Sequence, residues 1–424
     1  MKKQFKKRFP ENFDWGAAFA SYQVSGCKNT NWSDWEISPD RLKVIMNEKS
    51  EYYRYPLDNY ICGDACRHDK RFKSDFDLAK KLGHNAIRCG SEPAKIMPAK
   101  GVIDAHEIDR IVKMALYLKA LDIKVYWNLW HWTIPSWWED EGGWESPRAI
   151  EYFTSYVTAV VKALVPLGVT NWITMNETNV FAKLSYEFGL WPPQLKDVAK
   201  MEHVTAALAE GHIAAYKIIK AMCPDAKVGV AHAFGHNEIT EDTPEQRAWK
   251  EKGDLDWSRY FIDKITDYQD FIGINHYMRG LYDEKKKGPI FNDLGWEMHP
   301  RALYDTVMDV WNWYGKPIII TENGCADRKD SRRGWFLWES LLWLHKAIED
   351  GVPVFGYLHW SLMDNFEWAY GFWPRFGLVE IDRENNLKRR PRKSAYMYRD
   401  IIRLNGFNNE LAEKYWEAIR YPKK

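Results

Sequence analysis

Short apolar runs alternate along this chain with longer stretches whose apolar residues recur at helical spacing. The runs cover residues 15–20, 85–88, 124–129, 172–175, 227–232, 271–275, 317–321 and 354–359. Eight strands that alternate with helices favour a closed parallel sheet. The pattern therefore predicts an α/β fold, a (β/α)8 TIM barrel that occupies residues 1–424 as one domain.

The stretches between the strands carry helix signals of their own. Apolar residues at positions 108, 111, 112, 115 and 116 predict one buried helical face. Ser146 followed by Pro147 predicts an N-cap and first turn, and Gly351 predicts a helix end.

Two of the apolar runs end in an amide and a glutamate. Three isoleucines lead into Thr321-Glu322-Asn323-Gly324, and an earlier run ends in Asn176-Glu177. In such barrels the carboxyl ends of the strands carry the chemistry, so both glutamates are expected at one rim. A lone strand-end glutamate can equally form a structural ion pair. A facing pair suits glycosidic cleavage, because one acid protonates the leaving oxygen while the other attacks or activates water.

Composition narrows the possible partners. The chain has 60 basic and 59 acidic residues, a balance that gives no electrostatic footprint for nucleic acid. It has 23 tryptophans, whose flat faces suit the apolar faces of sugar rings. No run of about 18 apolar residues is present, and the basic N-terminus lacks an apolar segment. We therefore expect no membrane span and no signal peptide.

The six cysteines are too few and too scattered for a disulfide framework, which favours a reducing, cytoplasmic location. Cys62, Cys66 and His68 lie close together in sequence, and zinc is an alternative there. No second ligand pair accompanies them, so we expect neither a metal nor a cofactor.

The motifs together resemble glycoside hydrolase family 1, the β-glucosidase and β-glycosidase group, over nearly the whole length. The matching stretches are 13–18 with Gln23, 131–132, 174–177, 273–275 with Tyr277, 320–324, 360–368, 375–379 and 390–396. The last two are most similar to archaeal members. The resemblance implies the same barrel fold, with the active site at the C-terminal rim of its strands.

The resemblance also implies roles for individual residues. Glu322 would be the nucleophile and Glu177 the acid/base, with Arg88, Asn275 and Tyr277 supporting them. The residues implied to bind the sugar are Gln23, His131, Asn176, Trp360, Glu367 and Trp368. Simpler alternatives are a core histidine at 131 and a purely packing role for Trp368. Asp364, Asn365 and His359 are expected to shape the structure rather than touch substrate.

Four positions depart from the family pattern. Thr178 replaces a proline after the acid/base, and Ser25 replaces a glutamate two residues after Gln23. Pro93 replaces an aromatic residue, and Thr133 replaces an aspartate. These changes bear on sugar preference, rate and aglycone handling more than on the class of reaction.

The resulting hypothesis is a cofactor-free, retaining exo-β-glycosidase that acts on β-glucosides and tolerates galactose or fucose. Retention implies carboxyl groups about 5–5.5 Å apart. The alternatives are a β-transglycosidase of the same family and a catalytically impaired sugar-binding barrel. The pair Glu367-Trp368 argues against the phospho-sugar branch, and Asn275 stands where a Schiff-base barrel would need a lysine. A small carbohydrate is the expected partner, and the chain is a possible homo-oligomer.

Overall fold

The computed structural model describes residues 6–422 and has a closed barrel of eight parallel strands at its centre. The strands are β2 Asp14–Ala18, β3 Ala86–Gly90, β4 Lys124–Trp130, β5 Asn171–Asn176, β6 Lys227–Ala233, β8 Phe271–His276, β10 Ile318–Asn323 and β11 Val354–Trp360. They neighbour one another in chain order, and β11 closes the ring onto β2. The predicted (β/α)8 barrel is confirmed, with strand bounds within a few residues of the apolar runs.

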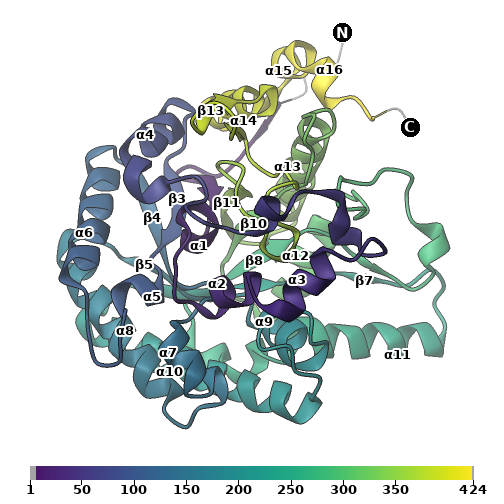
Figure 1. The fold of residues 1–424 in the computed structure, drawn as a ribbon. Coiled ribbons are helices and arrows are strands. Elements are labelled where there is room, and N and C mark those ends of the chain that lie inside the picture. The colour runs from purple at the N-terminus through teal and green to yellow at the C-terminus, as the bar shows by residue number, and fades with distance from the viewer. Residues whose placement is uncertain (1–5, 423–424) are drawn as a thin grey trace.

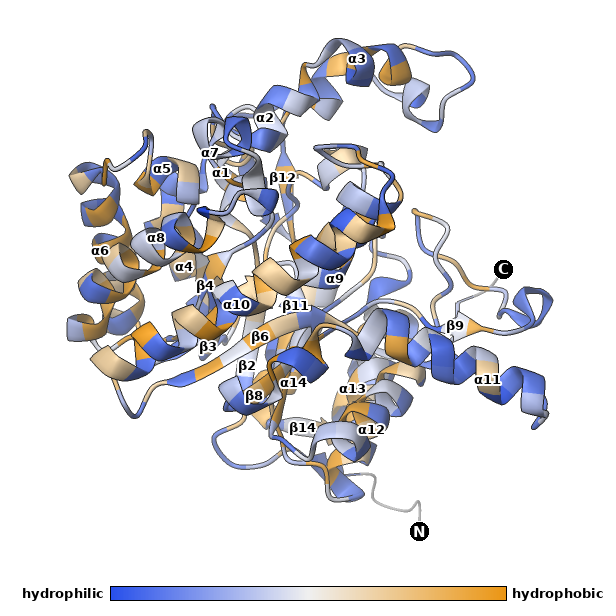
Figure 2. Cartoon of the chain, turned by 90° about the horizontal axis from the view of Figure 1, so that it is seen from below, coloured by the Kyte–Doolittle hydropathy of each residue, from blue (hydrophilic) through white to orange (hydrophobic). Residues whose placement is uncertain are grey.

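A main helix follows each barrel strand, and Figure 1 shows these helices around the sheet. They are α4 His68–Lys81, α6 Ala105–Ala120, α8 Ala149–Leu164, α10 Val198–Met222, α11 Pro244–Gly253, α12 Ala302–Tyr314, α13 Arg333–Glu349 and α14 Lys393–Leu404. Helix α11 is short and largely hydrophilic, and it extends away from the barrel (Figure 2). None of the helices within residues 6–422 has the length and apolarity needed to cross a bilayer.

Shorter elements lie in the loops and at the chain ends. The helices among them are α1 Ser21–Ser25, α2 Asn31–Glu36, α3 Pro39–Ile45, α5 Pro93–Ile96, α7 Ser136–Asp140, α9 Thr178–Ala182, α15 Asn409–Lys414 and α16 Trp416–Ile419. Two π-helical segments are η5 Lys183–Glu187 and η6 Asp254–Arg259. Three small sheets pair β1 Lys6–Arg8 with β14 Gly406–Asn408, β7 Asn237–Glu238 with β9 Gly280–Leu281, and β12 Val379–Asp382 with β13 Lys388–Pro391.

Two details of the helix predictions are wrong. Helix α8 begins at Ala149, two residues after the expected first turn, because the Ser146 side chain accepts a hydrogen bond from Arg148 N–H within a preceding turn. On α6 the buried face holds Ile111, Met114 and Leu118, whereas Leu116 is 46% exposed. The spacing predicted the helix correctly but misjudged its orientation on the barrel.

The core has two layers, one on each side of the barrel wall. The inner layer takes at least one buried residue from every strand: Ala18, Ala86, Tyr126, Ile173, Ala231, Phe271, Ile319, and Leu358 with Trp360. On β10 the flanking residues Ile318 and Ile320 belong instead to the large outer layer under the helices. Successive strand residues point to opposite faces, so a strand covered on both sides needs the continuous apolar run seen in the sequence.

Both strands that end in the candidate carboxylates have an irregular register just before them. Strand β5 shifts against β6 between Ile173 and Asn176, and β10 shifts against β8 between Ile320 and Glu322. Such bulges are common beside active sites because the additional residue re-aims the side chains that follow it. The fold therefore departs from regular pairing where it presents Glu177 and Glu322.

Candidate active site

A cavity of about 660 Å³ opens at the C-terminal rim of the barrel. Eight of the eleven residues expected in the site line it: His131, Glu177, Asn275, Tyr277, Glu322, Trp360, Glu367 and Trp368. Its volume is in the range of pockets that enclose small-molecule ligands. The strand ends and the loops after them thus bring together residues that are up to 237 positions apart in sequence, from His131 to Trp368 (368 − 131).

Glu322 is held by a cation and a hydroxyl. Arg88 Nη1 donates to Oε1, and the Tyr277 hydroxyl donates to Oε2 at 2.6 Å. Arg88 is fully buried on β3, so its charge acts in a region of low dielectric. Gly324 allows this strand end to lie against β11, since a Cβ there would be 2.0 Å from the Trp360 carbonyl oxygen.

Glu177 is held mainly through its backbone. It lies in the left-handed region, at φ 43°, and its N–H donates to the Ala231 carbonyl at 2.7 Å. Trp132 Nε1 donates to the carbonyls of Asn176 and Glu177, at 2.9 and 3.3 Å. The carboxylate itself accepts from Asn275 Nδ2 at 2.8 Å. No cation contacts this carboxylate among the described residues, in contrast to Glu322.

Asn176 connects the two acids. Its Oδ1 accepts from Arg88 Nη2 at 2.5 Å and from Asn275 Nδ2 at 3.0 Å. These two bonds orient the amide nitrogen of Asn176 toward His131 Nε2, which is 3.0 Å away. Burial, followed by the charge of Arg88, lowers the pKa of His131 well below its ordinary value. His131 is therefore neutral near pH 7, and its Nε2 is the accepting nitrogen.

The surroundings of Glu177 and Glu322 favour different protonation states for the two carboxyl groups. Burial, followed by the negative charge of Glu322, raises the pKa of Glu177 to about 8. Burial also raises the pKa of Glu322, but the Arg88 charge and the Tyr277 hydroxyl oppose this rise. Of the pair, Glu177 therefore holds the proton at neutral pH, and Glu322 carries the charge.

The part of the cavity wall formed by Glu367 and Trp368, which we call the inner end, combines a carboxyl group with aromatic rings. Burial and the Glu322 charge raise the pKa of Glu367 to about 8, and its Oε2 has no partner among the described residues. Trp368 packs against Trp132, with ring centroids 4.7 Å apart, and still lines the cavity. Trp368 therefore both packs against a neighbouring ring and borders the cavity.

Gln23 was predicted to bind the sugar, and its hydrogen bonds in the structure are to the loop after β11. Its side chain is fully buried and does not line the cavity. Its Nε2 donates to the Phe366 carbonyl at 2.7 Å and to Asn365 Oδ1 at 3.2 Å, so it supports the loop that carries Glu367. Its Oε1 is buried without a partner among the described residues.

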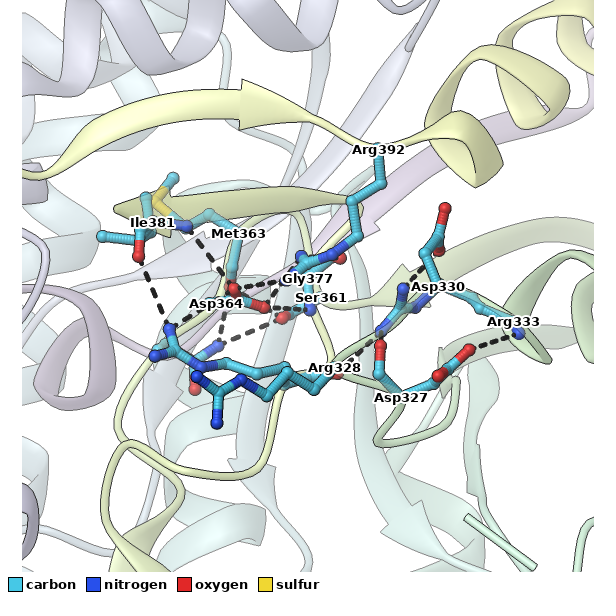
Figure 3. Close-up of polar contacts among 12 residues, drawn as sticks. Asp327, Arg328, Asp330, Arg333, Ser361, Met363, Asp364, Gly377, Ile381 and Arg392 are labelled. Carbon is cyan, nitrogen blue, oxygen red and sulfur yellow. Dashed lines mark hydrogen bonds and ion pairs between the residues drawn. The ribbon is translucent and has the colours of Figure 1, made fainter. Parts of the chain in front are cut away.

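Asp364 shapes the loop after β11, as expected. Arg392 donates to both of its oxygens, at 3.0 and 2.8 Å, and Gly377 N–H donates to Oδ1 at 3.0 Å. Figure 3 shows this group beside a second pairing of Arg333 with Asp327 and Asp330. Asn365 bonds to Ser361 and Met363 within the same loop. The cluster is behind the cavity and contributes no lining residue.

Two contributors to the site were not assigned roles from the sequence. Thr321 donates to Asn275 Oδ1 at 2.7 Å, which turns the Asn275 amide nitrogen toward Glu177. Trp132 holds the β5 terminus through the two bonds given above. Both belong to the motifs already recognised, and their positions beside Glu322 and His131 were the signal available.

The departures from the family pattern occupy structural positions. Thr133 Oγ1 lies 2.8 Å from both oxygens of Glu92, a buried acid whose pKa burial raises to about 7. Thr178 and Pro93 are the first residues of α9 and α5. Ser25 accepts the Asp69 N–H at 3.1 Å. None of the four lines the cavity.

The zinc alternative fails on geometry within residues 6–422. Cys62 and Cys66 each donate to a backbone carbonyl, and His68 Nδ1 contacts Asp75 at 2.9 Å. No group of three metal-ligating side chains is present in that described range.

A barrel with two carboxyl groups at its C-terminal rim is an arrangement that glycoside hydrolysis can use. The family model described as "Glycosyl hydrolase family 1" matches residues 5–268 and 258–407. The chain belongs to glycosyl hydrolase family 1.

Similar proteins come from several lineages. "Beta-glucosidase A" of Acetivibrio thermocellus is 29% identical over 95% of this chain and 100% of its own length. The "Galactolipid galactosyltransferase" SFR2 of Arabidopsis thaliana is 31% identical over 82% of this chain and 60% of its own. Among solved structures, the β-glycosidase from Pyrococcus horikoshii is 30% identical with a TM-score of 0.84, covering 97% of this chain and 98% of that one. The likeness to these proteins covers nearly the whole chain in fold as well as in sequence.

Proposed function

We propose that this protein is a retaining exo-β-glycosidase that hydrolyses the non-reducing-end bond of β-glucosides, with galactosides and fucosides as further substrates. One observation carries the proposal: Glu177 and Glu322 are buried carboxyl groups that share a cavity, but within residues 6–422 only Glu322 is bonded to a cation. A double displacement needs this asymmetry, because the nucleophile must be charged while the acid is protonated.

The reaction follows from these charges. Glu322 attacks the anomeric carbon as the bond to the aglycone oxygen breaks, and Glu177 gives its proton to that oxygen. The product of this step is a glycosyl ester on Glu322, with Glu177 now ionised. Glu177 then takes a proton from water, whose oxygen displaces Glu322 from the anomeric carbon. Two inversions leave the β configuration unchanged.

Unpartnered polar atoms support a sugar ligand at the inner end. Glu367 Oε2 and Gln23 Oε1 are buried and have no hydrogen-bond partner among the described residues. Leaving such groups unpaired costs free energy, and sugar hydroxyls can satisfy them. Glu367 borders the cavity directly, whereas Gln23 does not. Trp360, also in the lining, supplies a flat face for the ring.

A β-transglycosidase is the second candidate. The Arabidopsis relative is named a galactosyltransferase, and apolar residues surround much of the cavity. An apolar surrounding disfavours water relative to an alcohol acceptor at the glycosyl ester. The proportion of transfer product formed with added alcohol separates the two candidates.

The stereochemistry of the first product tests the proposal. Proton NMR during hydrolysis of an aryl β-glucoside should show the β-anomer of glucose first, with the α-anomer growing later by mutarotation. An α-anomer formed first would replace the covalent mechanism with direct attack by water. No release above a Glu322→Gln control would instead favour the sugar-binding barrel.

We also propose a reducing, cytoplasmic location. All six cysteines are free, and four of them are buried. Free buried thiols are typical of proteins kept in a reducing compartment. Size-exclusion chromatography with light scattering would test the possible homo-oligomer.

A further inference from the structure

The outer part of the cavity differs in chemistry from the inner part. Its walls come from α9, η5 and the chain after them on one side, and from the segments after β6 and β8 with η6 on the other. The large apolar residues among them are Val180, Leu184, Phe188, Leu190, Trp191, Phe234, Trp257 and Met278. We call this set the apolar entrance.

Several residues of the apolar entrance face solvent. Leu190 is 58% exposed, Phe188 is 44% exposed and Met278 is 41% exposed. Single exposed apolar residues are ordinary, but a group of them on the wall of one cavity marks a surface that gains from being covered. The covering molecule must enter beside Glu177 and Glu322, because the same cavity contains both acids.

The charged side chains at this end are already paired with protein partners. Lys183 pairs with Glu187 at 2.9 Å. Arg279 donates twice to Glu297, at 2.9 Å each, and also pairs with Glu238. A second sugar ring would lose water from its hydroxyls here and find few free partners among the described residues.

Two more lining side chains repeat this pattern. Asn237 Nδ2 donates to Asp254 at 2.8 Å, and Asp256 pairs with Lys252. By contrast, the inner end has Glu367 Oε2, which is buried and has no partner in the part of the chain that the structure describes. One end of the cavity is therefore built for hydroxyl groups and the other for hydrocarbon.

We propose that the apolar entrance is the binding site for one hydrophobic aglycone, so that the preferred substrates are β-glycosides of alkyl or aryl alcohols rather than oligosaccharides. This inference rests on the proposed function, since it places the sugar at the inner end. Burial of the aglycone chain against Leu190, Phe188 and Met278 supplies the preference.

A homologous substrate series tests the inference. The values of kcat/KM for methyl, butyl, hexyl and octyl β-glucoside should rise by roughly threefold for each methylene that enters the site. Octyl β-glucoside should exceed cellobiose by at least about tenfold. A flat series, or cellobiose as the better substrate, would overturn the inference while leaving a working glycosidase. No hydrolysis of any β-glucoside would overturn the proposed function as well.

A pair of variants locates the effect. Leu190→Ser should reduce the octyl-to-methyl ratio of kcat/KM by several-fold, because a hydroxyl replaces covered hydrocarbon. Leu116→Ser is the matched control, since Leu116 is 46% exposed on α6 and does not line the cavity. Equal ratios in wild type and Leu190→Ser would contradict a role for the apolar entrance, and thermal unfolding of both variants verifies that they fold.

Discussion

Two buried groups of charged side chains lie near the same rim of the barrel, and they differ in how completely their atoms are paired. In the first, both oxygens of Asp364 accept bonds from Arg392, and backbone N–H groups of Gly377 and Ile381 add to them. In the second, Glu177, Glu322 and Glu367 line a cavity, and Arg88 is bonded to only one of them.

The difference separates a structural cluster from a chemical one. A fully paired buried charge is stable where it is, whereas acids buried without cations have raised pKa values and open hydrogen-bonding capacity. The first group therefore should govern folding, and the second should govern turnover. The predictions below test this division by changing single residues in each group.

The largest effect is expected from Glu177→Gln. For an alkyl β-glucoside, kcat/KM should fall by about 10⁴-fold, because the leaving oxygen loses its proton donor. A dinitrophenyl leaving group needs no proton, so its glycosylation step should slow by less than about tenfold. The alkaline limb of the wild-type rate, near pH 8 from the raised pKa of Glu177, should disappear in the variant. Equal losses with both substrates would assign Glu177 another role.

The next effect is on folding, in Arg392→Met. This change leaves the buried Asp364 charge without its bidentate partner and should lower the free energy of unfolding by about 3–5 kcal/mol. Arg390→Met is the control, because Arg390 is half exposed in its pair with Asp382 and should change stability by less than about 1 kcal/mol. Chemical denaturation measures both. Similar values for the two variants would remove the distinction between the clusters.

The third effect is a pH dependence of stability that arises from Glu367. Its pKa of about 8 in the folded protein is above the ordinary value of 4.5, so the folded state retains a proton that the unfolded chain releases. The contribution is complete below about pH 4.5 and is lost as pH rises through 8. Glu367→Gln should therefore flatten this decline by a few kcal/mol.

Denaturation curves of wild type and Glu367→Gln between pH 5 and 8 give the measurement. Gln at the exposed position Glu384 serves as control and should leave the curve unchanged. Parallel curves for wild type and Glu367→Gln would show that Glu367 is ionised in the folded protein.

The smallest effect is expected from Tyr277→Phe. Loss of one hydrogen bond to a charged group should lower kcat by about 10- to 100-fold. Because that bond lowers the pKa of Glu322, its removal should move the acidic limb of the pH profile to higher pH. Tyr53→Phe, at a half-exposed residue outside the cavity lining, is the control. An unmoved acidic limb would limit Tyr277 to packing.

Much of the fold could be predicted because it depends on local pattern. The run Ile318–Ile320 alternates between inner and outer core, and this requires three apolar residues in a row. The register irregularities before Glu177 and Glu322 were not predictable, since they depend on pairing with β6 and β8. The start of α8 was wrong because a turn formed by Ser146 competes with the helix.

The sequence predicted the residues of the candidate site better than it predicted the hydrogen bonds among them. Eight of the eleven expected residues line one cavity, and Arg88 and Asn176 bond to them from behind. Gln23 turns toward the Phe366 backbone, a contact across 343 positions that no local pattern encodes. The apolar entrance was missed because its residues come from loops and short helices, where spacing carries little information.

Capture of the covalent intermediate tests the central claim most directly. A 2-deoxy-2-fluoro β-glucosyl fluoride should glycosylate the enzyme, because the fluoride at C1 leaves readily without a proton. Release should be slow, because fluorine at C2 disfavours the charge that develops in the transition state. Mass spectrometry of the digested protein should find one fluoroglucosyl group on the peptide that contains Glu322, and none in Glu322→Gln. Attachment to another residue, or steady hydrolysis of the fluoride without any attachment, would contradict Glu322 as the nucleophile.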